Sequence, residues 1–253
     1  QKNKKIHYLI CCLLTLIPFH KVGAQEFIIG VEDIYYYPLF EFKTERETFA
    51  KELLNEFAES RGYKFTYLPL PIKRFDKWLL EEKIDFKYPD NSRWYPDPTL
   101  KSKYTFSQPT IKLVAGTTVL KSFLKQDKSE FTSLGTLLGF YPTTWIEQIK
   151  SGRVKLYEDV STKILVRQLL EKNVDGIDIE PSVISYYLKE LGEPSDIVTI
   201  DKRYRYDVYE FHFSTIKYPK VIKEFNEFLN TNKTLLSELN RKYNITDYKP
   251  YLQ

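Results

Sequence analysis

The chain has 253 residues, of which 42% are hydrophobic and 28% charged, which is typical of a globular protein with one large domain or two small ones. Its formal net charge of +4 comes from the N-terminus, where Lys2, Lys4, Lys5 and Lys21 stand in a stretch without acids. Removing these four lysines from the 38 basic residues leaves as many bases as the 34 acids. The basic balance therefore gives no indication of a nucleic-acid partner.

Residues 1–24 predict a cleaved secretory signal peptide. A basic start precedes the apolar run IHYLICCLLTLIPF, which is too short to span a membrane, and small residues lead to Ala24. The residues before Cys11 and Cys12 are not the small ones that a lipoprotein signal needs. We therefore expect a soluble periplasmic protein that begins at Gln25; the alternative is a buried N-terminal helix.

The rest of the chain lacks the residues of several common kinds of active site. Both cysteines and two of the three histidines lie in residues 1–24, which leaves only His212. Disulfides, thiol chemistry, a histidine-based metal site and a Ser/His/Asp triad are then not expected. The nine glycines form neither a dinucleotide-binding nor a Walker loop. We expect no cofactor, no metal and no catalytic residue.

Strand and helix patterns alternate along the chain, which favours an α/β fold. Thr44 and Glu47 predict a capping box, Ser161 a helix cap, and Pro181 the first turn of a helix. The predicted strands are 26–32, 64–70, 85–90, 105–120, 136–142, 154–159, 176–180, 197–200 and 205–214. The predicted helices are 44–63, 74–84, 143–152, 161–174, 181–192, 218–230 and 234–244.

The order of these elements resembles that of the periplasmic solute-binding proteins that serve polar amino-acid ABC importers (family 3). The stretches that carry the resemblance are FIIGVEDIYYYPLFEF, FAKELLNEFAESRGYKFTYLPL, KIDFKYPD, YTFSQPTIKLVAG, LLEKNVDGIDIEPSVISYYL and VIKEFNEFLNTNKTLLSELNRKYNI. The resemblance implies a two-lobed clam with mostly parallel sheets and two crossing hinge strands, which binds its ligand between the lobes. Lobe one would comprise residues 25–113 with 214–253, and lobe two residues 114–213.

Tyr35, Tyr36 and Tyr37 follow the first predicted strand directly. In open α/β sheets, ligands bind beyond the carboxyl ends of the strands, so these phenols are placed to form a wall of the cleft. Their rings could stack on a planar ligand or hold an ammonium group. We expect at least Tyr35 or Tyr37 to contact the ligand; in the alternative, two of the three pack into lobe one.

The resemblance also implies an arginine of lobe one that binds the carboxylate of the ligand, and here the sequence departs from the pattern. Aligned from the TFS stretch, Leu100 falls at that position, beside Lys101. Aligned from IDF, Asn91 and Arg93 reach the strand end instead. A guanidinium suits a planar carboxylate, so Arg93 is the preferred anion anchor, with Asn91 as a second contact. Two alternatives remain open: Lys101 could be the anion anchor instead, or Arg93 could be a surface residue in a turn without a ligand contact.

In lobe two, the stretch GFYPTTW ends a strand and begins a helix. The backbone N–H groups and hydroxyls of Thr143 and Thr144 predict an anion site, or helix capping alone. By resemblance, Glu180 falls where the family places the carboxylate that accepts the ligand's ammonium group. The alternative for Glu180 is a solvated turn residue, and Asp178 on the same strand is the second choice.

Three functions follow. The first is a monomeric binding protein that captures a small polar solute, such as an amino acid, for a membrane importer. The second is the same fold used as a sensor or orphan binder without a transporter. The third is a dehydratase of cyclic amino-acid precursors, a reaction that some relatives of this fold carry out, but no acid–base spacing favours it.

Overall fold

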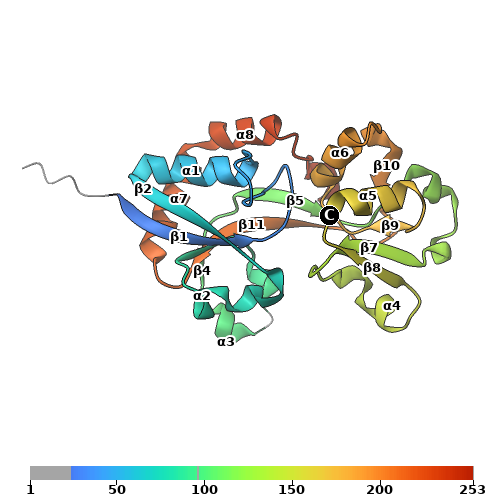
Figure 1. The fold of residues 1–253 in the computed structure, drawn as a ribbon, viewed down its shortest axis with the longest axis horizontal. Helices are drawn as coiled ribbons and strands as arrows, with labels where there is room; N and C mark the ends of the chain where they lie inside the picture. The colour runs from blue at the N-terminus through green and yellow to red at the C-terminus, as the bar shows by residue number, and fades with distance from the viewer. Residues whose placement is uncertain (1–23, 96, 253) are drawn as a thin grey trace, which may run out of the picture.

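The computed structural model of the chain describes residues 24–95 and 97–252. The predicted signal peptide lies outside these residues, except for Ala24. Two α/β bodies stand side by side in Figure 1, and the strands β5 and β11 run between them. We call the body built on β1, β2 and β3 lobe one, and the body built on β6 to β10 lobe two. The described residues form no helix long and apolar enough to cross a membrane.

Lobe one is built on a six-stranded sheet with the order β2–β1–β3–β11–β4, in which β5 pairs with β11. Strands β1, β2 and β3 are parallel, whereas β11 runs antiparallel to β3, β4 and β5. The strands are β1 (Gln25–Glu32), β2 (Tyr63–Leu70), β3 (Phe86–Asp90), β4 (Thr105–Phe106), β5 (Ile111–Ala115) and β11 (Asp207–Thr215). Its helices are α1 (Phe49–Arg61), α2 (Trp78–Glu81), α3 (Pro98–Lys101), α7 (Pro219–Thr231) and α8 (Lys233–Lys242).

Lobe two is built on a five-stranded sheet with the order β10–β6–β9–β7–β8. Its strands are β6 (Thr118–Leu120), β7 (Ser133–Leu137), β8 (Lys155–Asp159), β9 (Gly176–Ile177) and β10 (Val198–Ile200). Its helices are α4 (Ile146–Lys150), α5 (Thr162–Leu170) and α6 (Pro181–Glu190). Short 3-10 turns complete the chain: η1 (Ile72–Lys77), η2 (Ser92–Trp94), η3 (Lys121–Lys125), η4 (Lys128–Glu130), η5 (Thr143–Trp145), η6 (Ser195–Ile197) and η7 (Lys249–Tyr251).

The α/β class and the two-lobed arrangement predicted from sequence are confirmed, and the sheets combine parallel and antiparallel pairing. Parallel pairing is confined to β2–β1–β3 and to β8–β7–β9, and the remaining strand pairs are antiparallel. The reason is the return of the chain: a strand that comes back from the other body enters the sheet in the opposite direction.

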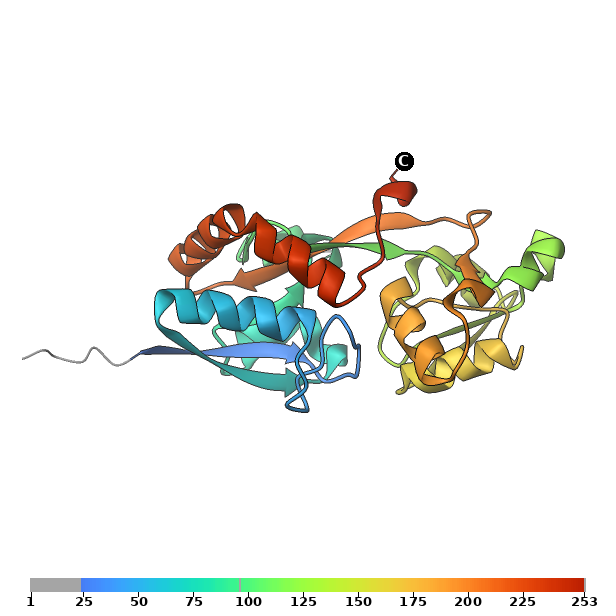
Figure 2. The ribbon, with the colours of Figure 1, turned by 90° about the horizontal axis from the view of Figure 1, so that it is seen from above.

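The crossing strands form an antiparallel ribbon. Strand β5 leaves lobe one and pairs with the returning β11, with Ile111 opposite Phe211 and Ala115 opposite Asp207. The C-terminal segment adds a further link between the bodies, because the N–H of Thr246 donates to the Ser182 hydroxyl at 2.8 Å. Figure 2 shows this segment passing over the crossing strands after α8.

Apolar periodicity explains how the helices lie on the sheets. The inward face predicted for α1 is confirmed, since Phe49, Leu53, Leu54 and Phe57 are all buried. The Ser161 cap is also confirmed, and its hydroxyl accepts from the Ile164 N–H at 3.3 Å.

The capping box predicted at Thr44 is wrong. Helix α1 begins later, and its N-cap is Thr48, whose hydroxyl accepts from the Lys51 N–H. The Thr44 hydroxyl donates instead to the Glu41 carboxylate at 2.6 Å and accepts from the Arg46 N–H at 3.3 Å, before the helix begins.

Candidate functional site

A cavity of about 780 Å³ lies between the two lobes and against the crossing strands. A cavity of this size suits a small organic molecule. Lobe one lines it with Glu32, Tyr36, Phe40, Ile72, Lys73, Phe75, Asp76, Arg93 and Trp94. Lobe two contributes Gly139, Phe140, Tyr141, Thr143, Thr144, Asp178, Ile179 and Glu180. The crossing segments contribute Val114, Ala115, Arg205, Tyr206, Asp207, Tyr209 and Phe211.

Tyr36 is the tyrosine of the consecutive three that lines the cavity, and it joins the two lobes. Its ring contacts Phe140 of lobe two with a centroid distance of 5.6 Å. Its hydroxyl accepts a hydrogen bond from the backbone N–H of Glu180 at 3.0 Å. An isolated bridge between Tyr36 and Phe40 turns the chain here, so that these two side chains face the cleft.

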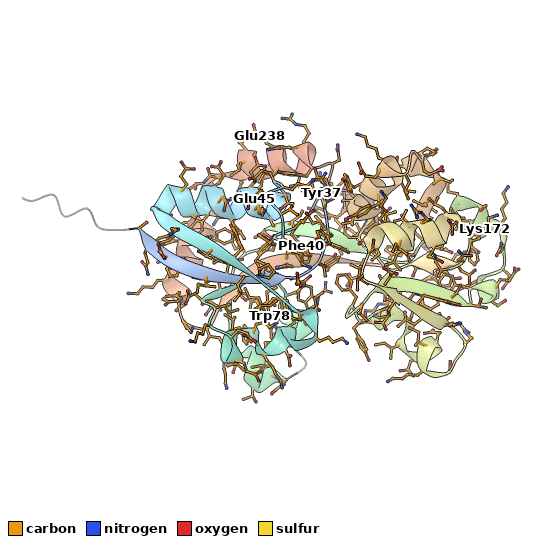
Figure 3. All side chains as sticks on the ribbon, viewed as in Figure 1. Tyr37, Phe40, Glu45, Trp78, Lys172 and Glu238 are labelled. Carbon is orange, nitrogen blue, oxygen red and sulfur yellow. The ribbon has the colours of Figure 1, made fainter. Side chains whose placement is uncertain are left out.

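Neither Tyr35 nor Tyr37 lines the cavity, so the contact of either residue with the ligand stays a prediction. Tyr35 is 45% exposed, and Lys43 lies over its ring at 5.2 Å. Tyr37 packs against Tyr186 of α6 at 4.4 Å, and the Arg46 guanidinium lies 3.5 Å from its ring centroid. Figure 3 shows Tyr37 and Phe40 on the side of lobe one that faces lobe two. Tyr37 therefore contacts the other lobe outside the cavity.

Arg93 lines the cavity as predicted from its position, but its guanidinium already has partners. Nη1 contacts the Asp207 carboxylate at 2.7 Å, and Nη2 donates to the Val208 carbonyl at 3.1 Å. Asn91 does not line the cavity: its side chain is buried, accepts from the Arg93 N–H and donates to the Glu210 carbonyl. Lys101 ends α3 and lies outside the cavity lining. The predicted anion anchor is therefore a residue already engaged in an ion pair.

Thr143 and Thr144 both line the cavity, but they cap no helix. They form a single 3-10 turn with Trp145, and the following helix α4 has only five residues and no side-chain cap. The helix-cap alternative is wrong, because the turn comes before the helix. A dipole from so short a helix is weak, so the threonine hydroxyls are the main polar groups of this wall.

Glu180 lines the cavity and also has a structural role that the sequence did not suggest. It is the N-cap of α6: its carboxylate accepts from the N–H groups of Ser182 at 2.6 Å and Val183 at 3.3 Å. The Ser182 hydroxyl donates to the same carboxylate at 3.2 Å. Burial raises the pKa of Glu180 to about 7, although these hydrogen bonds oppose the shift. The alternative of a solvated turn residue is wrong.

Besides the exposed Asp76, two other carboxyls line the cavity without a hydrogen bond to any described residue. Asp178 follows β9 in lobe two, and burial raises its pKa to about 6. Glu32 is the last residue of β1 in lobe one and is 6% exposed. Burial raises the pKa of Glu32 to about 8, against the opposing effect of the Lys87 ammonium. Glu32 was not predicted as a site residue. The sequence feature that could have indicated it is an acidic residue at the end of a buried strand.

Behind Glu32, lobe one holds a buried charge network. Lys87 is fully buried, lies 3.5 Å from the Asp90 carboxylate and donates to the Phe75 carbonyl at 2.9 Å. Burial lowers the pKa of Lys87 to about 8. Its ammonium also contacts the Tyr95 hydroxyl and lies near four aromatic rings, those of Phe75, Trp78, Tyr95 and Tyr104. Among the described residues, no group of three or more His, Cys, Asp or Glu is arranged to hold a metal ion.

No protein-family model matches the chain, and no curated protein matches it. Solved structures do match in fold. The ligand-binding core of GluR0 in complex with L-glutamate has a TM-score of 0.67 at 15% identity, covering 87% of this chain and 99% of that one. A substrate-binding protein of an ABC uptake transporter from Streptococcus pneumoniae, with bound histidine, has a TM-score of 0.65 at 18% identity, covering 86% and 92%.

A third match is the ancestral amino acid-binding protein AncCDT-1, a precursor of cyclohexadienyl dehydratase. It has a TM-score of 0.63 at 18% identity, and the match covers 86% of this chain and 95% of that one. These likenesses establish the class of fold: a two-lobed α/β structure like that of periplasmic binding proteins.

Proposed function

We propose that the chain is an exported binding protein that captures a small polar solute, an amino acid or a similar molecule, between its two lobes. The observation that carries this proposal is the cavity of about 780 Å³, which is lined by both lobes and by the crossing strands. A site built from two bodies around a hinge closes on its ligand and sheds water. The bound glutamate and histidine named for two proteins of the same fold support this reading.

Delivery to a membrane importer and export to the periplasm belong to the same proposal. The sequence of residues 1–24 supports export, and the match to the substrate-binding protein of an uptake transporter supports a permease partner. A sensory or orphan binder on this fold is the alternative. Export is tested by intact mass after expression with the leader in a Gram-negative host. The expected mass is that of a chain beginning at Gln25, and full-length protein in the cytoplasm would count against export.

A dehydratase is the second candidate, and one observation favours testing it. The carboxyls of Asp178 and Glu180 face the cavity with pKa values of about 6 and about 7, the range that suits a general acid or base near neutral pH. Incubation with prephenate-like compounds, followed by detection of the aromatic product, separates turnover from binding. We expect no turnover.

The binding proposal is tested by calorimetry with anionic, zwitterionic, neutral and cationic solutes, followed by small-angle scattering with the best ligand. We expect one class to bind with a micromolar or lower dissociation constant and to make the protein more compact. An equal radius of gyration with and without a bound ligand would remove hinge closure from the mechanism. A lack of binding to all four classes would overturn the proposed function.

A further inference from the structure

The ionisable groups that line the cavity are predominantly acidic. The lining contains three bases. Lys73 and Arg205 have exposed side chains, and Arg93 is paired with Asp207. The acids of the lining are Glu32, Asp76, Asp178, Glu180 and Asp207, and the bases are Lys73, Arg93 and Arg205.

The three acids in the interior of the cavity, Glu32, Asp178 and Glu180, have no basic side chain within ion-pair distance among the described residues. Burial of a carboxylate without a compensating charge is unfavourable, and a cation supplied by a ligand would remove that cost. The N–H groups that Glu180 caps partly compensate its negative charge. Glu32 and Asp178 have no such hydrogen bonds, so a ligand cation would stabilise these two carboxylates most.

The acidic lining is one indication of a cationic ligand, and the environment of Glu32 is a second, independent one. Its side chain is more than nine-tenths buried, faces the cavity, and has no hydrogen-bond partner among the described residues. Lys87, the nearest base, is committed to Asp90 and to the Tyr95 hydroxyl. A buried polar group of this kind is normally satisfied by a partner, and the cavity is the space from which a partner can reach it.

Two tyrosine side chains lie beside these carboxyls in the cavity. Tyr36 and Tyr209 both line the cavity, and each phenol lies within the electrostatic field of Glu32, Asp178 and Glu180. The two tyrosines therefore stand close to a carboxyl of lobe one and to two carboxyls of lobe two. Ring faces attract ammonium and guanidinium groups, most strongly where water is excluded.

The same features distinguish between kinds of cation. The three carboxyls do not converge into a group that could hold a metal ion. The cavity volume of about 780 Å³ instead has room for a molecule of several non-hydrogen atoms. A ligand carboxylate, in contrast, would have to share the Arg93 guanidinium with Asp207 and the Val208 carbonyl, or bind the exposed Lys73 or Arg205, whereas the buried ionisable groups of the lining are acids.

We propose that the cavity selects an organic cation without a carboxylate group, whose amine or guanidinium is held between Glu32 of lobe one and Asp178 of lobe two, against the rings of Tyr36 and Tyr209. This inference rests on the proposed function, because it names the class of solute that the binding protein captures. It replaces the Arg93–Glu180 clamp for a zwitterion that the sequence suggested.

Matched pairs of compounds that differ only in the α-carboxylate test the inference by calorimetry. Agmatine is compared with arginine, and cadaverine with lysine, while glutamate and an uncharged sugar complete the panel. We expect the decarboxylated member of at least one pair to bind tenfold or more tightly than its amino acid. Tighter binding of the amino acid, of glutamate or of the sugar would overturn the inference and leave the proposed function standing.

Two variants locate the cation. Asp178→Asn keeps the shape of the side chain and disrupts no hydrogen bond of that side chain among the described residues, so it should weaken binding of the preferred amine by tenfold or more. Glu32→Gln should do the same. The control is Glu190→Gln, at the exposed C-terminal end of α6, which should leave affinity within twofold.

The outcomes separate the two proposals. If Asp178→Asn and Glu32→Gln both bind the amine within twofold of the unaltered protein, the carboxyl clamp is wrong even though a cation binds. If no compound of the panel binds, the inference and the proposed function fail together. Circular dichroism of each variant shows that a loss of affinity comes from a folded protein, and if Glu32→Gln does not fold, Asp178→Asn alone decides.

Discussion

Lobe one and lobe two both present buried carboxyls to the cleft, but among the described residues only lobe one holds a buried base behind them. In lobe one, Lys87 lies beside Asp90 and within reach of the field of Glu32, so the charges of this body are partly balanced. In lobe two, Asp178 and Glu180 have no base within ion-pair distance among the described residues. In lobe one, a ligand cation thus adds to the positive field that Lys87 already supplies at Glu32, whereas in lobe two the positive charge comes from the ligand alone.

The buried charges of the two lobes therefore have different effects on stability. A fully buried ion pair adds little net stability, yet removal of one partner is costly because the other charge is left behind. A buried acid without a partner has the opposite effect: it destabilises the empty protein and favours the bound one. The predictions below change the two lobes separately and run from the largest expected effect to the smallest.

Lys87→Met should destabilise lobe one by about 3–5 kcal/mol, because it leaves the buried Asp90 carboxylate without its base. Urea unfolding of the empty protein measures this. The matched control is Lys242→Met on α8, whose pair with Glu52 is solvent-exposed and should contribute at most about 1 kcal/mol. Equal losses in the two variants would show that the buried network does not stabilise lobe one.

The empty protein should become less stable as the pH rises from about 5 to 8. Burial raises the pKa values of Asp178, Glu180 and Glu32 to about 6, 7 and 8 in the folded state, above their ordinary values of 3.8, 4.5 and 4.5. In this window the folded state therefore binds more protons than the unfolded state, and stability falls with pH. Within this window the three shifts span about 1, 2 and 3 pKa units, which would correspond to at most about 8 kcal/mol. Because the cavity admits water, we expect a smaller loss of about 3 kcal/mol, or roughly 6–12 °C in melting temperature.

Other ionisable groups near these carboxyls could also change stability with pH, so the control must separate their titration from that of the carboxyls. Glu32 faces Lys87 and Asp90 of β3, while Asp178 and Glu180 face the phenols of Tyr36 and Tyr209. The other ionisable groups of the cavity lining are Lys73, Asp76, Arg93, Arg205 and Asp207. Lys87 titrates near pH 8, at the upper edge of the window. The Lys87→Met variant should therefore keep the fall between pH 5 and 7, and a flat profile would contradict the raised pKa values.

Asp178→Asn should stabilise the empty protein at pH 8 by about 1–2 kcal/mol while it weakens cation binding. The full shift of the pKa, from 3.8 to about 6, corresponds to roughly 3 kcal/mol, and partial exposure reduces this. Near pH 4 the gain should largely disappear, because the carboxyl is then protonated in the folded state. Thermal unfolding at both pH values measures the difference, with the exposed Asp196→Asn as control. Destabilisation at pH 8 would indicate an unrecognised structural role for Asp178.

The elements and helix faces were predictable from sequence because they follow from local periodicity, as the buried face of α1 shows. The site residues were predicted less well. Which of three consecutive tyrosines faces the cleft depends on the bridge between Tyr36 and Phe40, and no periodic pattern encodes that turn. The pairing of Arg93 with Asp207 joins residues 114 positions apart, so it could not be seen without the fold.

The smallest expected effect concerns the hydrogen bond that joins the lobes through Tyr36. Tyr36→Phe keeps the ring against Phe140 but removes the acceptor of the Glu180 N–H, which lies 3.0 Å from the hydroxyl. When the lobes separate, water can replace this acceptor, so the loss falls mainly on the closed form. We expect about 0.5–1.5 kcal/mol, or a roughly 2- to 12-fold weaker affinity for the ligand.

Tyr35→Phe provides the comparison within the same stretch. Its ring is 45% exposed and outside the cavity lining, so this variant should bind ligand within twofold of the unaltered protein. Calorimetry on the two variants decides between the tyrosine predicted from sequence and the one that faces the cleft. A larger loss in Tyr35→Phe than in Tyr36→Phe would restore the sequence prediction. It would also mean that the lobes close on the ligand in a different arrangement, in which Tyr35 rather than Tyr36 reaches lobe two.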